Sequence, residues 1–194
     1  MAAFGATYLV VAPITAEGSN TITYGTGKQV RHLRRAAITY NWDESKFNGD
    51  NTLAEYYRHL IDADLEFETT ELDTDVAVMM GLEKQKTAAS TGTPAVYTMK
   101  TDNGDPVGIG FVQSLIVDGD KLSRAIWVHK VTMRQNSENA TTKEDTISWQ
   151  APTVQGKGWP VMLDASGEDQ IRDFSVFEDE ADAIAWLKAK AGIS

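Results

Sequence analysis

Alternating apolar and polar positions recur along most of this chain, and this period-2 pattern indicates strands with one buried face. The first run covers Phe4 to Ala12 and is predicted to stop at Pro13. A short run follows at Thr21–Tyr24. Further on, Leu65 and Phe67 alternate with acids, as expected for a strand with one solvated face. The pattern predicts a mainly β protein.

A long hairpin is predicted in the second half of the chain. Val107–Val117 forms an extended apolar face, and Asp118-Gly-Asp-Lys121 has turn chemistry. Ala125–Met133 has the spacing of its partner strand. Thr146–Trp149 is predicted as a further strand.

The segment from Ala36 to Leu60 leaves two readings open. Its first part is a strand with Ala36 and Trp42 on one face, and Asn48-Gly-Asp-Asn51 forms a tip that tolerates positive φ. Beyond the tip, Thr52-Leu-Ala-Glu55 matches a helix capping box, but the following Tyr56-Tyr57 pair suits the return arm of a hairpin. These residues alone do not decide between helix and strand at 53–60.

Two helices are expected. A short one lies near 74–80, with Asp73 as its N-cap and Gly81 as its stop. A longer one lies near 178–191, started by a capping box at Ser175–Glu178 or by Asp179. The elements together predict a β-rich single domain over residues 1–194, with one short and one longer helix.

Composition removes several kinds of chemistry. The 194 residues include no cysteine, which excludes disulfides, thiolate zinc sites and cysteine nucleophiles. The N-terminus lacks the basic region of a signal peptide, and no apolar run is long enough to span a membrane. We expect a soluble protein made in a reducing compartment.

The net charge is concentrated in one stretch. Twelve acids lie between Asn41 and Glu83, opposed only by Lys46 and Arg58, so this stretch accounts for the whole formal net charge of −10. Such a surface does not hold nucleic acid by neutralising phosphates, but it can repel it.

A small basic cluster precedes the acidic stretch. It lacks the interleaved aromatics of a nucleic-acid patch. A surface with one basic and one acidic region can instead dock to a copy of itself, so these residues are candidate inter-subunit contacts. They are Lys28, Arg31, Arg34 and Arg35.

No motif supports catalysis. Gly25-Thr-Gly27-Lys28 lacks the first glycine and the hydroxyl residue of a phosphate loop. The three histidines have no metal-ligand spacing, and no serine lies in a nucleophile elbow. Alternating acids are more often a solvated strand face than a glycosidase pair. We therefore predict no catalytic, cofactor-binding or metal-binding residue and no enzyme activity.

Several stretches resemble the major tail (tail tube) proteins of long non-contractile-tailed bacteriophages. The similarity covers most of residues 1 to 160 and consists of pattern and order. The stretches are Tyr8–Thr15 with Thr23-Tyr24-Gly25, Leu65–Leu72 with Met79–Leu82, and Arg124–Val131 with Thr141–Trp149 and Val154–Gly156.

The resemblance implies a β-sandwich protomer flanked by a helix. Six protomers form a ring, and stacked rings form a virion tail tube, assembled in the host cytoplasm, that carries viral DNA without binding it specifically. Implied partners are further copies of the chain and the tail-tip initiator, tape-measure and terminator proteins, with no membrane and no cofactor. The family's long hairpin, which lines the bore or reaches the next ring, corresponds best to 36–60, which favours strand at 53–60. The chain from about Leu163 matches the family less clearly, so 163–194 is a C-terminal extension of the tail-tube β-sandwich or barrel.

An acidic lining would keep DNA from the wall of such a tube, so we expect four acids of the hairpin to face the lumen: Asp43, Glu44, Asp50 and Glu55. Two other functions stay open. One is a ring protein of a related bacterial injection system. The other is a β-sandwich carbohydrate-binding or adhesin module, which would expose aromatics and stay monomeric.

Overall fold

A nine-stranded antiparallel sheet organises the computed structural model, which describes residues 2–49, 52–137, 151–163 and 168–193. The chain is mainly β, as predicted. Along the sheet the order is β2-β1-β8-β9-β10-β5-β4, with β3 paired to β1 and β13 to β9. The strands are β1 (Ala2–Glu17), β2 (Ile22–Tyr24), β3 (Lys28–Val30), β4 (Leu33–Gly49), β5 (Thr52–Thr69), β8 (Val107–Val117), β9 (Asp120–Arg134), β10 (Thr153–Gly158) and β13 (Arg172–Phe177).

The β8–β9 hairpin is the centre of this sheet, and its prediction is confirmed. Asp118 and Gly119 form its turn with φ of 53° and 98°. One edge of β9 pairs with β8, whereas β13 and β10 share the other edge, at Ser123–Val128 and Val131–Arg134. The sheet therefore divides at β9, which leaves the two branches free to diverge.

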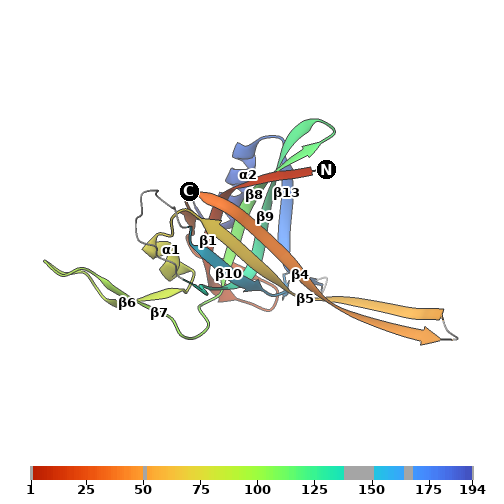
Figure 1. Ribbon diagram of the computed structural model, residues 1–194, viewed down its shortest axis with the longest axis horizontal. Coiled ribbons are helices and arrows are strands. Elements are labelled where there is room, and N and C mark those ends of the chain that lie inside the picture. The colour runs from red at the N-terminus through yellow and green to blue at the C-terminus, as the bar shows by residue number, and fades with distance from the viewer. Residues whose placement is uncertain (1, 50–51, 138–150, 164–167, 194) are drawn as a thin grey trace, which may run out of the picture.

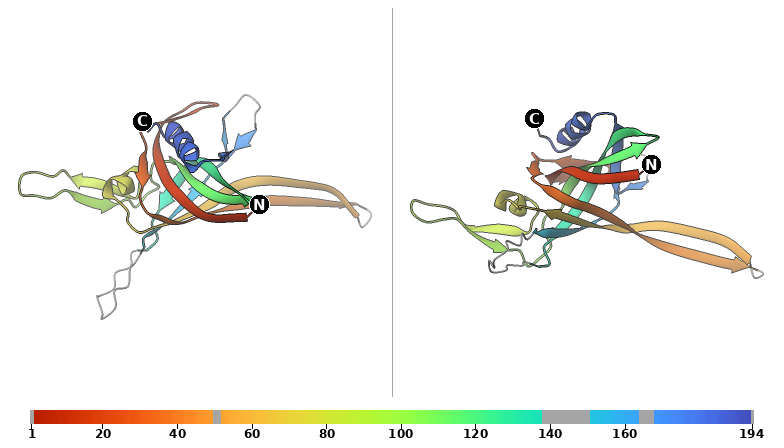
Figure 2. Two further views of the ribbon diagram at one scale, coloured as in Figure 1. Left: turned by 90° about the horizontal axis from the view of Figure 1, so that it is seen from above. Right: turned by 45° about the horizontal axis from the view of Figure 1, so that its top comes forward.

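The main core lies inside the curled sheet. In Figure 1, β4, β5 and β10 cross in front of β1, β8 and β9, and Figure 2 shows the same strands from two further directions. Apolar side chains from both layers meet between them, including Leu9, Phe67, Ile109 and Val128. The short helix α1 (Thr74–Met79) adds Val76 to the same cluster.

A second core lies on the opposite face of β1, β8 and β9, under the helix α2 (Glu180–Lys190). Here the fully buried Trp127 packs with Leu187 of the helix. The close approach needs a glycine, because a Cβ on Gly110 would lie 2.6 Å from Leu187 and 2.7 Å from Trp127.

Both predicted helices are present. The side chain of Asp73 caps α1 by accepting a hydrogen bond from the Asp75 backbone, and Gly81 follows with φ of 70°. The predicted capping box at Ser175 is wrong, because Ser175 lies in β13 and pairs with Ala125. Asp179 is the N-cap of α2, although its side chain makes no capping hydrogen bond.

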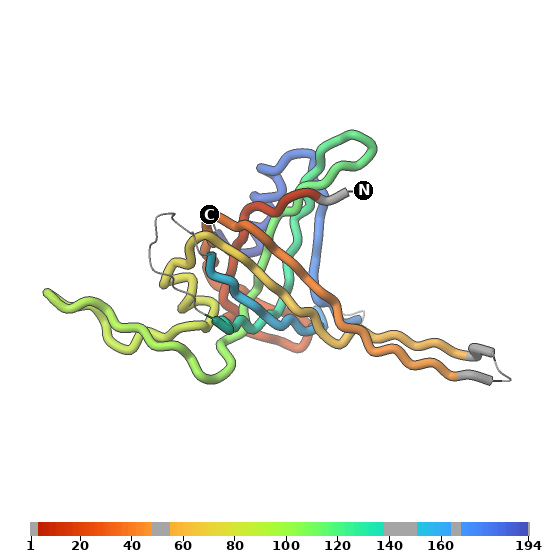
Figure 3. Tube along the Cα trace, in the orientation of Figure 1, coloured from red at the N-terminus to blue at the C-terminus, as the bar shows by residue number. Residues whose placement is uncertain are grey.

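The open question at 53–60 is resolved in favour of strand. β4 and β5 pair from Leu33↔Thr69 to Gly49↔Thr52. Their far half extends beyond the body of the protein as a two-stranded projection (Figures 1 and 3). We call residues 42–60 the arm.

Two other expectations need correction or lie outside the structure. β1 does not stop at Pro13 but continues to Glu17, because its partner changes there from β8 to β2 and the missing N–H interrupts neither ladder.

A second projecting hairpin, β6 (Glu83–Thr87) with β7 (Val96–Met99), was not predicted. The strand predicted at Thr146–Trp149 lies outside the described residues. The remaining pair is β11 (Val161–Met162) with β12 (Asp169–Gln170).

Removing the helix's main anchor is expected to weaken the second core. Leu187→Ala should lower the free energy of unfolding by about 2–5 kcal/mol, because the rigid surroundings leave a cavity. Urea denaturation measures this. The exposed control Ala189→Ser should stay within about 0.5 kcal/mol, and equal values for the two variants would refute the anchoring role of Leu187.

Candidate functional site

The outward face of β4, β5 and β10 is polar along the body of the protein. On β5, Ala63, Leu65 and Phe67 are buried, so the alternate residues project away from the core. We call this surface the polar face. Its members on the three strands are Arg35, Asn41, Asp62, Asp64, Glu66, Glu68, Gln155 and Lys157.

Each acid of the polar face has a partner within the chain. Nη1 of Arg35 lies 2.6 Å from Oε1 of Glu66, and Nη1 of Arg34 lies 2.9 Å from Oε1 of Glu68. The Lys157 amine is 3.0 Å from Asp62 and 3.8 Å from Asp64. The four acids of this strand therefore share three cations, and they do not form a strongly negative surface.

Asn41 completes this network. Its amide donates to Asp62 at 2.7 Å and to Asp64 at 2.8 Å, which holds the two carboxylates side by side. The hydrogen bonds from Asn41 and Lys157 hold the pKa of Asp62 below its ordinary value, and Asp62 in turn raises the pKa of Lys157. Lys157 was not among the predicted site residues, because only the β5–β10 register brings it opposite Asp64.

The predicted basic cluster is largely paired within one chain. Besides Arg34 and Arg35, Lys28 lies 2.6 Å from Asp75. Arg31 is exposed and has no ion pair among the described residues. These pairs already provide the acidic partners that a neighbouring copy was expected to supply. The inter-subunit role of the four residues stays a prediction.

The acids expected at the lumen lie on two faces of the arm. Asp43 is opposite His59 and Glu55 is opposite Phe47, so both acids share the side of the polar face. Glu44 projects to the other side, where it lies 3.9 Å from Arg58. Asp50 lies outside the described residues. Among those that are described, Asp43 and Glu55 have no ion pair.

Large aromatic side chains are exposed along the arm. Phe47 is 68% exposed and Tyr57 is 65% exposed on one face, whereas Trp42 is 43% exposed on the other. The Arg58 guanidinium stacks 3.8 Å above the Trp42 ring. Exposed aromatics gathered on a projecting hairpin indicate a contact surface. The sequence shows these residues, but their exposure depends on how far the arm extends past the core.

A polar cluster lies beside α2, where four elements meet. The Tyr24 hydroxyl donates to the His129 carbonyl at 2.9 Å, and its ring packs edge-on against Trp127. His129 Nε2 lies 3.2 Å from the Asp173 carboxylate without hydrogen-bond geometry, and Lys190 donates to Asp173 at 2.6 Å. His129 is therefore a buried residue of β9, two positions from Trp127 on the same strand.

Burial sets the protonation of this cluster. It lowers the pKa of His129, against the opposing effect of Asp173, and it raises the pKa of Tyr24 to about 12. The imidazole is therefore neutral at neutral pH. A surface pocket of about 330 Å³ adjoins these side chains, and Asn20 and Thr21 are among the other residues that line it.

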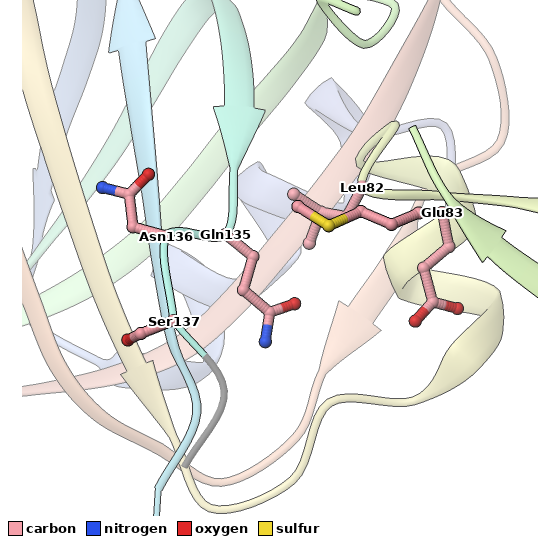
Figure 4. A pocket seen from close by; sticks show the side chains of 6 residues that line it. Leu82, Glu83, Gln135, Asn136 and Ser137 are labelled. Carbon is pink, nitrogen blue, oxygen red and sulfur yellow. The ribbon is translucent and has the colours of Figure 1, made fainter. Parts of the chain in front are cut away.

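Another pocket, of about 300 Å³, lies at the base of β6 and β7. Figure 4 shows Gln135, Asn136 and Ser137 on one side and Leu82 and Glu83 on the other. Among the described residues that line it, Glu83 alone is titratable, so these residues provide no acid–base pair. Within the described part of the chain, no group of side chains is arranged to bind a metal ion.

No protein-family model matches this sequence, and no curated protein matches it. Neither helix of the described chain has the length and apolar composition needed to cross a membrane. The functional argument therefore starts from the arm and the polar face.

Stability is expected to fall on mild acidification because of His129. Its pKa is lower in the folded state, so the unfolded state binds the proton first and the protein loses stability as the pH falls below about 6.5. His129→Gln should flatten the decline in urea midpoint between about pH 7.5 and about pH 5.5. The control His59→Gln, at an exposed histidine, should leave the decline in urea midpoint unchanged. An unchanged slope in His129→Gln would contradict this assignment.

Proposed function

We propose that this protein is the structural subunit of a bacteriophage tail tube, assembling as stacked hexameric rings through which viral DNA passes. The observation that carries the proposal is the arm, a long two-stranded projection with exposed aromatics and no core of its own. A monomer gains nothing from exposing this surface, whereas a ring buries it between copies.

Open strand edges support assembly. In the described sheet, β4 is a terminal strand and β13 pairs on one side only. Unpaired edges invite pairing with another chain, and a closed ring removes them. The resemblance of residues 1–160 to tail tube proteins agrees with this use.

The polar face suits the wall of a DNA channel. Its cations Arg35 and Lys157 are held by carboxylates, as is the neighbouring Arg34. Paired cations are less available to phosphates, so DNA would slide past without the salt-dependent contacts that retard it. We place this face toward the lumen. Asp43 and Glu55 lie on the same side of the arm, whereas Glu44 does not.

A carbohydrate-binding module is the second candidate. The exposed aromatics of the arm favour it, since sugars stack on such rings. However, the Arg58 guanidinium already covers one face of Trp42. A monomeric binding module also leaves the open strand edges of β4 and β13 unexplained, so the tail tube accounts for more of the structure.

Electron microscopy of the purified protein tests the proposal. We expect six-fold rings or tubes with a central channel, because the arm and the open edges are self-complementary. A variant lacking residues 43–57 should stay monomeric while keeping the cooperative unfolding of the body. Wild-type protein that stays monomeric at its solubility limit and also in the presence of tail-tip initiator would refute the proposal.

Freeing the arginines near the polar face should create affinity for DNA. In Glu66→Gln/Glu68→Gln, Arg34 and Arg35 lose their carboxylate partners, so fluorescence anisotropy should show tighter DNA binding that weakens steeply with salt. The control Glu178→Gln/Asp182→Asn changes the net charge equally away from this face. Equal affinities in both variants would contradict the assignment of the lumen.

A further inference from the structure

Two arginines flank an exposed phenylalanine where β13 joins β9. Arg124 lies 5.5 Å and Arg172 lies 5.4 Å from the Phe174 ring. The register puts all three side chains on the same side of the sheet as the main core. Phe174 is nevertheless 55% exposed and the neighbouring Val176 is 42% exposed. We call these four residues the arginine face.

The arginine face lacks counter-charge. Among the described residues, neither Arg124 nor Arg172 has an ion pair, in contrast to Arg34, Arg35 and Lys157 on the polar face. Arg124 donates from Nη2 to Gln113 at 2.9 Å, and its Nε is buried without a partner. Two like charges beside an uncovered apolar surface form an unfilled site, which a carboxylate with an aromatic neighbour would complete.

The arm carries the complementary groups. Its unpaired acids Asp43 and Glu55 share one face with Phe47 and Tyr57, the two most exposed aromatics of the described chain. Apolar and acidic groups thus lie together on a projecting surface.

The spacing of the charges also matches. In the β4–β5 register Glu55 is opposite Phe47, and Asp43 lies four positions before Phe47 on β4. The two acids therefore lie on adjacent strands, four positions apart along the strand direction. Arg172 and Arg124 are likewise four positions apart on adjacent strands, because Arg172 is opposite Val128 and Arg124 is opposite Val176. At about 3.3 Å per residue, both pairs span roughly 13 Å along the strands.

We propose that the arginine face receives the arm of a second copy of this chain, with Asp43 and Glu55 neutralising Arg172 and Arg124 and with Phe47 and Tyr57 covering Phe174 and Val176. This contact rests on the proposed function, since it joins neighbouring subunits of the tube. It places Asp43 and Glu55 in a subunit contact instead of the lumen, and leaves the channel wall to the polar face.

A copy of the chain fits this site better than nucleic acid does. One arm offers two carboxylates at the matching spacing, beside aromatic side chains that can cover Phe174 and Val176. Two arginines alone would also give a nucleic acid little contact.

Paired charge reversals test the contact. The first variant is Arg124→Glu/Arg172→Glu, and the second is Asp43→Lys/Glu55→Lys. Each alone should weaken self-association on the order of 30-fold or more, measured by analytical ultracentrifugation and electron microscopy. An equimolar mixture should assemble again, because each mutated face then meets an oppositely charged partner. The control Lys84→Glu/Lys86→Glu makes the same charge change as the first variant on exposed residues of β6.

The outcomes are distinguishable. If wild-type protein assembles and both variants assemble equally well, the contact is wrong while the tube proposal stands. Wild-type protein that never self-associates overturns both. DNA binding that Arg124→Glu/Arg172→Glu abolishes would assign the arginine face to nucleic acid instead. The second variant is a safeguard against misfolding, because its substitutions lie on the exposed arm. If the mixture of the two variants fails to assemble, the proposed charge pairing is refuted directly.

Discussion

The pairing of β4 with β5 is the interaction on which the rest of the structure depends. Near the body it buries Leu65 and Phe67, and beyond Leu60 it continues without a core beneath it. The register shift between Asn41 and Trp42 leaves Ile61 as an extra residue, which keeps Leu60 on the core side. One hairpin thus anchors the sheet and exposes a surface that the monomer cannot bury.

This pairing also sorts the charges of the chain. On the body it aligns Arg35 with the acids of β5 and, through β10, Lys157 with Asp62. On the arm, Asp43 and Glu55 have no ion pair within the described chain. Among the twelve acids of the acidic stretch, the four acids of the polar face are therefore paired with cations while these two carboxylates are not, and the two groups have different roles in our account.

Local patterns predicted the elements whose cause is local. The β8–β9 hairpin follows from alternation and a turn at Asp118-Gly119, and α1 follows from its Asp73 cap. The predictions were wrong where pairing with a segment distant in sequence determines the local structure. Pro13 does not end β1, because β1 changes there from one partner strand to another. Ser175 does not cap a helix, because it lies in β13 and pairs with Ala125 of β9. Likewise, the sequence does not single out Lys157 or the arginine face, because only the strand register places these side chains beside their neighbours.

The central claim is that the arm is buried against a neighbouring copy while the polar face lines a channel. A cryo-electron microscopy reconstruction of the assembled protein tests it most directly. Our account predicts a six-fold ring in which Phe47 and Tyr57 contact the next subunit and Glu66 and Lys157 face the bore. An assembly with the arm free in solvent, or with the polar face on the outer surface, would contradict it.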